Sequence, residues 1–457
     1  MREGAIQTRY FMGNYFIKLG YFFMQRYHDQ RNRFLKKLGE DAALLFSAPE
    51  HHRNGDAEYP YRQSSDLIYL TGWIQPQAVV LLRPGAKEPF IMFVQPKEPS
   101  REIWTGIRPG PEGAVEIYGA DAAYPISELK KRIPALLQGY TGLHYDFGEN
   151  EEHDSLVRKA IATARKLGKD NGMDVPNRIC SLAHTLHELR LIKSEDEIEV
   201  IKKAASITKD AHCAAMKATK PGVYEYELEA ELLYHFRKNG GSGPGYTPIV
   251  GGGANAVILH YIENDSPLQD GDLVCIDAGC EYEWYTADVT RTWPVNGTFT
   301  PAQKELYAAV LTAQEKSIQA SIVGNSFMDI HYATVRSLTQ SMIRLGFLEG
   351  DVEELIEEKA YKEWYMHGTS HWLGMDVHDV GSYASKGSSM PLDAGMVLTI
   401  EPGLYIAADD ERVPIQYRGM GIRIEDDILI TEDGPVILTE EIPKSIEDIE
   451  SYMKGQV

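Results

Sequence analysis

The stretch at residues 273–297, LVCIDAGCEYEWYTADVTRTWPVNG, carries two acidic residues eleven positions apart, Asp277 and Asp288. An apolar run leads into Asp277, which predicts a carboxylate at the exit of a buried strand, where an unpaired charge is costly. If residues 274–277 and 287–290 are antiparallel strands joined by a turn near 281–284, both carboxylates meet at one end of the hairpin. The alternative is a pair of solvated acids beside a turn, and the apolar run argues against it.

A faint repeat connects this stretch with a later one, since residues 268–279 and 392–403 share a pattern. In each, Leu-x-x-Gly leads through an apolar run to an acidic residue that stands two positions before a glycine. That acidic residue is Asp277 in the first segment and Glu401 in the second. A turn followed by a buried strand produces such a pattern. Two related half-domains that face each other across a site would explain it, and chance is the rival explanation.

Two further segments supply candidate ligands. His371 lies in HGTSHWLGMDVH at residues 367–378, with His367 and His378 beside it. Three closely spaced histidines among glycines indicate one metal ligand and two partners that bind substrate or transfer protons, although a single histidine is more often structural. Glu425 lies in IRIEDDILI at residues 422–430, where alternation places it on the same strand face as Arg423. The acids after Glu425, Asp426 and Asp427, are expected on an exposed strand face.

Four carboxylates and one imidazole form an oxygen-rich set suited to two divalent cations: Asp277, Asp288, His371, Glu401 and Glu425. Two cations that share a water lower its pKa from about 15.7 towards neutrality, and the resulting hydroxide attacks an acyl carbon. An imidazole beside one metal would stabilise the oxyanion. The sequence has no G-x-S-x-G motif and no Cys–His signature of covalent catalysis. The pattern therefore predicts metal-assisted hydrolysis.

Composition limits the class of protein. The 457 residues suffice for two domains, and a net charge of -21 argues against nucleic acid and against an anionic membrane surface as partners. The four cysteines show no zinc spacing, which favours a reduced, cytoplasmic location, and Cys275 is expected to be a buried inert thiol. The aromatic-rich residues 10–24 are shorter than a membrane span and lack a cleavage site, so we expect a peripheral appendage there.

Local patterns divide the chain into two domains. The first, mixed α/β, is predicted to have strands at 78–82, 90–94 and 143–146 and helices at 127–137 and 154–169. A capping-box pattern at Ser194 predicts a helix through about Lys217, and the next helix is expected at 225–238. We expect the domain boundary near residues 180–190, followed by glycine-rich turns and β-branched strands.

Several stretches closely resemble the aminopeptidase P and prolidase family of dinuclear metallopeptidases. They are LVCIDAGCEYEWYTADVTRTWPVNG, MHGTSHWLGMDVHDVG, VLTIEPGLYI, YRGMGIRIEDDILIT and the N-terminal EYPYRQSSDLIYLTGW and EIWTG. The resemblance runs from about residue 28 to the C-terminus. It implies an α+β fold: a creatinase-like α/β domain at 28–185 and a pita-bread catalytic domain at 186–457, after an extension of unknown role at 1–27.

The resemblance also implies roles for individual residues. Two Mn(II) ions are expected, with Asp277 on one, His371 and Glu401 on the other, and Asp288 and Glu425 bridging them. Catalytic roles fall to His260 near the scissile bond, to His378 at the tetrahedral intermediate, and to Glu401 as proton acceptor. The proline pocket is expected to involve His367, Tyr405, Arg423 and, from a neighbouring subunit, Trp104. A homo-oligomer, dimer or tetramer, is therefore expected.

The expected activity is release of the N-terminal residue from peptides with proline in second position. A prolidase restricted to Xaa-Pro dipeptides is the nearest alternative. A non-catalytic peptide-binding module is an alternative of another class, and the complete ligand set argues against it.

Overall fold

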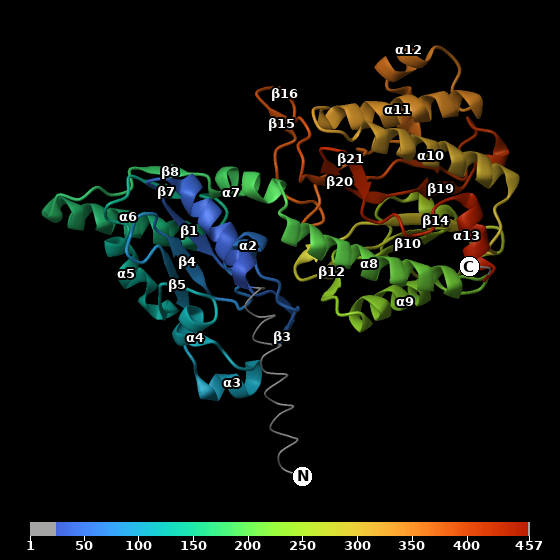
Figure 1. The fold of residues 1–457 in the computed structure, drawn as a ribbon. Helices are drawn as coiled ribbons and strands as arrows, with labels where there is room; N and C mark the ends of the chain where they lie inside the picture. Colours follow the sequence, from blue (N-terminus) through green and yellow to red (C-terminus); the bar gives the residue numbers. More distant parts are fainter. Residues whose placement is uncertain (1–23, 456–457) are drawn as a thin grey trace, which may run out of the picture. The chain divides into compact units, whose positions relative to one another are not determined.

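The computed structural model describes residues 24–455, and the chain divides into two compact units between Leu189 and Arg190. Figure 1 shows both units. Most of the aromatic-rich residues 10–24 and of the extension at 1–27 lie outside the described range. Within that range no helix has the length and apolarity needed to span a membrane.

The first unit is built on a six-stranded sheet with the strand order β6-β5-β4-β1-β7-β8. β1 pairs antiparallel with β4 and parallel with β7. Alternate side chains of β1, β4 and β5 pack against helices α5 and α6 and form the core on that face. The strands are β1 (Ala42–Phe46), β2 (His52–Asn54), β3 (Ala57–Glu58), β4 (Val79–Leu82), β5 (Phe90–Val94), β6 (Ala122–Pro125), β7 (Gly142–His144) and β8 (Arg178–Cys180).

The helices of this unit, after helical residues 24–38, are α2 (Ser65–Thr71), α3 (Pro99–Thr105), α4 (Gly110–Glu116), η1 (Ile126–Glu128), α5 (Leu129–Leu136), α6 (Glu151–Asn171) and α7 (Leu182–Leu191), within which the division between the units falls. The predicted strands at 78–82 and 90–94 and the predicted helix at 154–169 are confirmed to within a few residues. The helix predicted at 127–137 is a short 3-10 turn followed by α5.

The second unit has several short sheets between two pairs of helices. Figure 1 shows strands β10, β14, β19 and β20 between the pair α8 and α9 and the pair α10 and α11. Its helices are α8 (Glu195–Ala218), α9 (Glu225–Lys238), η2 (Gly253–Val257), α10 (Pro301–Ala320), α11 (Phe327–Arg344), α12 (Val352–Glu357), η3 (Ala360–Glu363), η4 (Ile415–Tyr417) and α13 (Ile446–Met453). The capping box predicted at Ser194 is present, because its hydroxyl accepts the N–H of Glu197, whose carboxylate returns to the N–H of Ser194.

The sheets of this unit have the orders β10-β11-β14, β13-β12-β9, β15-β16, β17-β20-β21 and β18-β19. The strands are β9 (Gly243–Pro244), β10 (Ile249–Gly252), β11 (Leu273–Asp277), β12 (Cys280–Tyr282), β13 (Tyr285–Thr286), β14 (Thr290–Pro294), β15 (Ala384–Ser385), β16 (Ser388–Ser389), β17 (Val397–Ile400), β18 (Gly403–Ile406), β19 (Met420–Arg423), β20 (Asp426–Thr431) and β21 (Gly434–Ile437). Cys275 in β11 is buried, and burial raises the pKa of its thiol, which agrees with the inert thiol that we expected.

The two Leu-x-x-Gly segments have the same local structure. Gly271 and Gly395 have φ angles of +90° and +91°, a left-handed conformation that glycine adopts without a steric penalty. Each precedes a buried strand, β11 or β17, and each of these strands has an antiparallel partner, β14 or β20. The repeat therefore exists in the backbone as well as in the sequence.

The hairpin predicted for the first segment is only partly correct. β11 does pair antiparallel with the chain that follows, but the partner strand β14 begins at Thr290, which lies opposite Asp277. Residues 287–289 are outside the strand because the chain first forms a small hairpin, β12–β13, which pairs with β9. The turn predicted near 281–284 belongs to that hairpin, with Glu283 and Trp284 at positive φ.

The expectation that Asp426 and Asp427 are exposed is wrong. Both side chains are fully buried, because β20 is the central strand of the sheet β17-β20-β21. Asp426 forms ion pairs with Arg291 at 2.7 Å and with Lys444 at 2.6 Å. The Asp427 carboxylate accepts the backbone N–H of Asp288. The alternation of apolar and charged residues in this strand reflects a buried polar network and not a solvated face.

Candidate metal centre and active site

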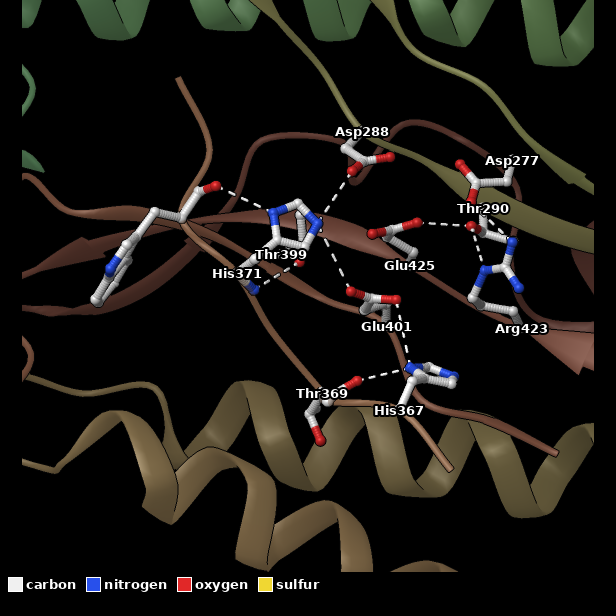
Figure 2. Close-up of polar contacts among 12 residues, drawn as sticks. Asp277, Asp288, Thr290, His367, Thr369, His371, Thr399, Glu401, Arg423 and Glu425 are labelled. Atoms are coloured by element: carbon white, nitrogen blue, oxygen red, sulfur yellow. Dashed lines mark hydrogen bonds and ion pairs between the residues drawn. The ribbon is translucent and has the colours of Figure 1, made fainter. Parts of the chain in front are cut away.

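The five candidate ligands come from separate segments and converge on one place in the second unit. Figure 2 shows their side chains together. Asp277 ends β11, Glu401 directly follows β17, and Glu425 lies in the two-residue break between β19 and β20. Asp288 and His371 lie in loops. Ligand atoms of Asp288, His371 and Glu425 all lie within 4.8 Å of one another.

The imidazole of His371 is oriented by its own backbone environment. Its Nδ1 lies 3.0 Å from the carbonyl oxygen of Trp372, so Nδ1 carries the proton and donates it. That leaves Nε2 facing Asp288 Oδ2 at 3.3 Å and Glu401 Oε1 at 3.6 Å (Figure 2). A second hydrogen bond that fixes the tautomer is usual for a histidine that binds a metal.

The carboxylates of the centre repel one another in a buried place. Burial, with the charges of neighbouring acids, raises the pKa of Asp288 and raises the pKa of Glu401 to about 7. The same causes raise the pKa of Glu425 well above its usual value. His371 has the opposite shift, because Asp288 and Glu401 outweigh the effect of burial and raise its pKa to about 9.

The chemistry of these side chains fits divalent cations. The centre brings four carboxylates into a site where the positive groups are Arg423 and, when protonated, His371. Bound cations would supply the missing positive charge and stabilise the ionised carboxylates. Oxygen ligands with one imidazole suit hard or borderline metal ions.

A chain of hydrogen bonds continues from the centre to the residues expected around the proline pocket. Arg423 Nη2 donates to Asp277 Oδ2 at 2.7 Å, and Arg423 Nη1 donates to the Tyr405 hydroxyl at 3.1 Å. That hydroxyl lies 2.8 Å from His367 Nε2, while His367 Nδ1 lies 3.6 Å from Glu401 Oε2. Thr290 joins the other side, since its hydroxyl donates to Glu425 at 2.6 Å and accepts from Arg423 Nε at 3.1 Å.

A cavity of about 450 Å³ opens over the centre and is lined by all five candidate ligands and by the three other histidines of the predicted site. His260 lies in the loop after η2 with an exposed side chain. His378 is also exposed, and its ring lies edge-on to that of His371, with the centroids 4.4 Å apart. Both imidazoles are therefore accessible to a molecule that enters the cavity.

Tyr246 is a residue of the centre that the sequence did not reveal. Its hydroxyl lies 2.6 Å from Asp277 Oδ1 and 2.5 Å from Asp288 Oδ1, so that it connects two candidate ligands. Burial and these carboxylates raise the pKa of the phenol well above its usual value, which keeps it protonated as a donor. The one signal in the sequence was a lone aromatic residue within the glycine-rich GGSGPGYTPIVGGG.

Trp104 is the one predicted site residue that belongs to the first unit. It lies on α3 in the first unit, its side chain is 86% exposed, and it does not line the cavity. Ile103 and Ile107 beside it are 82% and 84% exposed. A role for Trp104 in the proline pocket remains a prediction.

Comparisons with known proteins agree with this arrangement. The model of metallopeptidase family M24 matches residues 199–432, and the model of the aminopeptidase P N-terminal domain matches residues 27–144. The Xaa-Pro aminopeptidase of Escherichia coli (strain K12) is 44% identical over 432 residues, which cover 94% of this chain and 97% of the relative.

Solved structures match over the same extent. The Pseudomonas aeruginosa aminopeptidase PepP superposes with a TM-score of 0.92 at 44% identity, covering 94% of this chain and 98% of that one. A zinc-substituted E. coli aminopeptidase P in complex with product gives a TM-score of 0.91 at 44% identity, covering 95% of this chain and 99% of that one. The chain therefore belongs to metallopeptidase family M24, as a member of its aminopeptidase P type.

Proposed function

We propose that this chain releases the N-terminal residue from peptides whose second residue is proline. The observation that carries the proposal is the convergence of four carboxylates and His371 under a cavity that His260, His367 and His378 also line. The 44% identity to an Xaa-Pro aminopeptidase over almost the whole chain supports the same activity.

The proposed metal ligands follow the sequence prediction. Asp288 and Glu425 would hold both cations, Asp277 would hold one of them, and His371 with Glu401 would hold the other. The short distances from His371 Nε2 to Asp288 and Glu401 support this division. We propose Mn(II) as the metal. Two such cations would supply an activated water and polarise the scissile carbonyl.

The protein's own side chains then position the peptide and move its protons. Glu401 is proposed to accept a proton, because its carboxylate lines the cavity and lies 3.6 Å from both His371 Nε2 and His367 Nδ1. His378 is placed at the cavity surface, where its imidazole can donate to a developing oxyanion. His260 lines the same cavity and is proposed to contact the peptide near the scissile bond.

The proline ring is proposed to lie beside His367, Tyr405 and Arg423. The Tyr405 hydroxyl is held between the other two, so the buried phenol links His367 and Arg423, which both lie on the wall of the cavity. The large exposure of Trp104 supports its completion of this wall in a neighbouring subunit. We accordingly propose a homo-oligomer, a dimer or tetramer, in the cytoplasm.

A series of peptides tests the activity directly. The full chain, stripped of metal with a chelator, should be inactive, and added Mn(II) should restore cleavage of Xaa-Pro-Xaa between its first two residues. Xaa-Ala-Xaa serves as the control for proline specificity. Cleavage of Xaa-Pro dipeptides alone would identify a prolidase, and binding without hydrolysis would identify a peptide-binding module. Full activity of the stripped protein would contradict the metal mechanism.

A further inference from the structure

A second cluster of side chains of the kinds that bind metals lies in the first unit. The proposed activity uses none of these side chains. Asp41, His144 and Cys180 each place one ligand atom within 4.8 Å of the others. Asp41 Oδ2 and His144 Nε2 are 3.5 Å apart, with 10% and 11% of the side chains exposed. Cys180 is a free, half-buried cysteine.

The sheet register brings these residues together. His144 of β7 lies directly opposite Cys180 of β8 in a parallel pair, and Asp41 immediately precedes β1, on the other side of β7. Paired residues in neighbouring strands direct their side chains to the same face. The three groups therefore emerge side by side from three strands, on the face opposite the core of α5 and α6.

Two neighbouring residues, Gly142 and Thr185, help to position Asp41 and His144. Asp41 fits because residue 142 is glycine: a Cβ there would lie 2.5 Å from the Asp41 carboxylate. The Thr185 hydroxyl lies 3.4 Å from His144 Nδ1. It can accept a hydrogen bond from a proton on Nδ1, and the lone pair of Nε2 is then free to face Asp41 and Cys180. A hydrogen bond on the far nitrogen is what a metal-binding imidazole requires.

One member of the cluster, Asp41, already has a cationic partner in Arg178. Arg178 Nη2 lies 2.8 Å and 2.9 Å from the two Asp41 oxygens. The Arg178 side chain is 54% exposed, so it can turn into water and leave the position to another cation. The Asp41 carboxylate has enough lone pairs to bind a metal and a guanidinium at the same time.

We propose that Asp41, His144 and Cys180 bind one Zn²⁺ that ties together β1, β7 and β8 at the edge of the first unit's sheet. A thiolate, an imidazole and a carboxylate are zinc ligands, and the sulfur discriminates against Mg²⁺, Ca²⁺ and Mn²⁺. Tetrahedral bonds of about 2.0–2.3 Å place such ligand atoms roughly 3–4 Å apart, so a modest contraction closes the site. Thiolate and carboxylate together balance the two positive charges of the ion.

Cobalt in place of zinc tests the site in the full chain. The centre of the second unit offers only oxygen and nitrogen ligands, so thiolate-to-Co²⁺ absorption reports on the proposed site alone. About one equivalent of Co²⁺ should produce this absorption, Cys180→Ser should abolish it, and the matched variant Cys213→Ser should keep it. Asp288→Ala should also keep it. Absence of the absorption in the unaltered chain, or its survival in Cys180→Ser, would overturn the proposal.

Two further measurements do not depend on the folding of Cys180→Ser. Zn²⁺ should slow alkylation of Cys180 in the unaltered chain by about tenfold or more, as located by peptide mass spectrometry, because a coordinated thiolate is a poorer nucleophile than a free one. Arg178→Met should tighten Co²⁺ binding, because it removes the competing cation. An unchanged alkylation rate, or weaker binding by Arg178→Met, would contradict the assignment.

Discussion

The backbone N–H of Asp288 lies 3.2 Å from each carboxylate oxygen of Asp427, so a fully buried acid fixes the loop that presents a proposed bridging ligand. The sequence placed Asp427 on an exposed face. In the structure Asp427 instead holds the backbone of Asp288 in place. The N–H of Asp427 itself donates to the Thr439 hydroxyl.

Replacement of Asp427 by alanine should weaken metal binding by about 10–100-fold, the usual cost of removing a group that orients a ligand. Titration calorimetry with Mn(II) measures it. Asp427→Asn is the matched control, because its amide oxygen can still accept the Asp288 N–H. Equal losses for both variants would show that charge, and not orientation, is what Asp427 supplies.

Asp288→Ala should abolish tight metal binding, because it removes a carboxylate that faces both His371 and Tyr246. Metal content after gel filtration measures this loss. Asp433→Ala, at an exposed turn, is the control and should retain its metal. Normal metal content in Asp288→Ala would exclude a bridging role.

His378→Ala should leave metal content unchanged and lower kcat by about 10²–10³-fold, the typical effect of removing one donor to an oxyanion. The exposed ring is close to that of His371 but has no ligand position in the proposed centre. Steady-state kinetics on Xaa-Pro-Xaa, with metal analysis in parallel, measure both quantities. If KM alone rises, His378 binds substrate and does not stabilise the transition state.

Asp379→Ala should lower the free energy of unfolding by about 3–5 kcal/mol, because it leaves buried cations without their partner. Asp379 Oδ1 lies 2.6 Å from Arg190 and Oδ2 lies 3.0 Å from Lys193, and the side chains of all three are at most 3% exposed. Urea unfolding measures the change. Asp376→Asn, which alters the more exposed partner of Arg190, should cost much less.

His212 predicts acid sensitivity. Burial lowers its pKa to about 4, its Nε2 donates to the Ala278 carbonyl oxygen at 2.9 Å, and its Nδ1 has no partner among the described residues. The unfolded histidine binds a proton below about pH 6.5 and the folded one does not, so stability falls as the pH drops from about 6.5 towards 4.

His212→Gln removes this titration. Between pH 6.5 and 5 the unaltered chain should lose about 2 kcal/mol more unfolding free energy than the variant. Urea unfolding at the two pH values gives the difference for each protein. Parallel losses in both would place the acid sensitivity elsewhere.

Predictions from the sequence succeeded for features that residues of a single short segment determine. The apolar run before Asp277 and the capping box at Ser194 depend on neighbours within a few residues, and both match the structure. Tyr246 shows no periodicity, so nothing local pointed to its contacts with Asp277 and Asp288. Its position becomes meaningful only when β10 and β11 pair.

Asp426 shows the opposite error. The alternation in IRIEDDILI predicts a half-exposed strand, and that inference fails when partners from distant segments bury the polar face. Arg291, Gln314 and Lys444 all reach Asp426 and lie between 18 and 135 residues away in the chain. No single segment records such partners, so the exposed and buried interpretations look identical in the sequence.

The order of the ligands along the chain has a consequence for biosynthesis. Asp277 and Glu425 are 148 residues apart in the chain, and the N–H of Glu425 donates to the carbonyl oxygen of Thr290, 135 residues earlier. A nascent chain that ends with the first repeat, residues 268–279, holds only one of the five ligands, Asp277. Loops this long close late and slowly. The metal centre therefore forms only after nearly the whole polypeptide has been made. A chain that ends before Glu425 lacks a ligand and cannot form the complete centre.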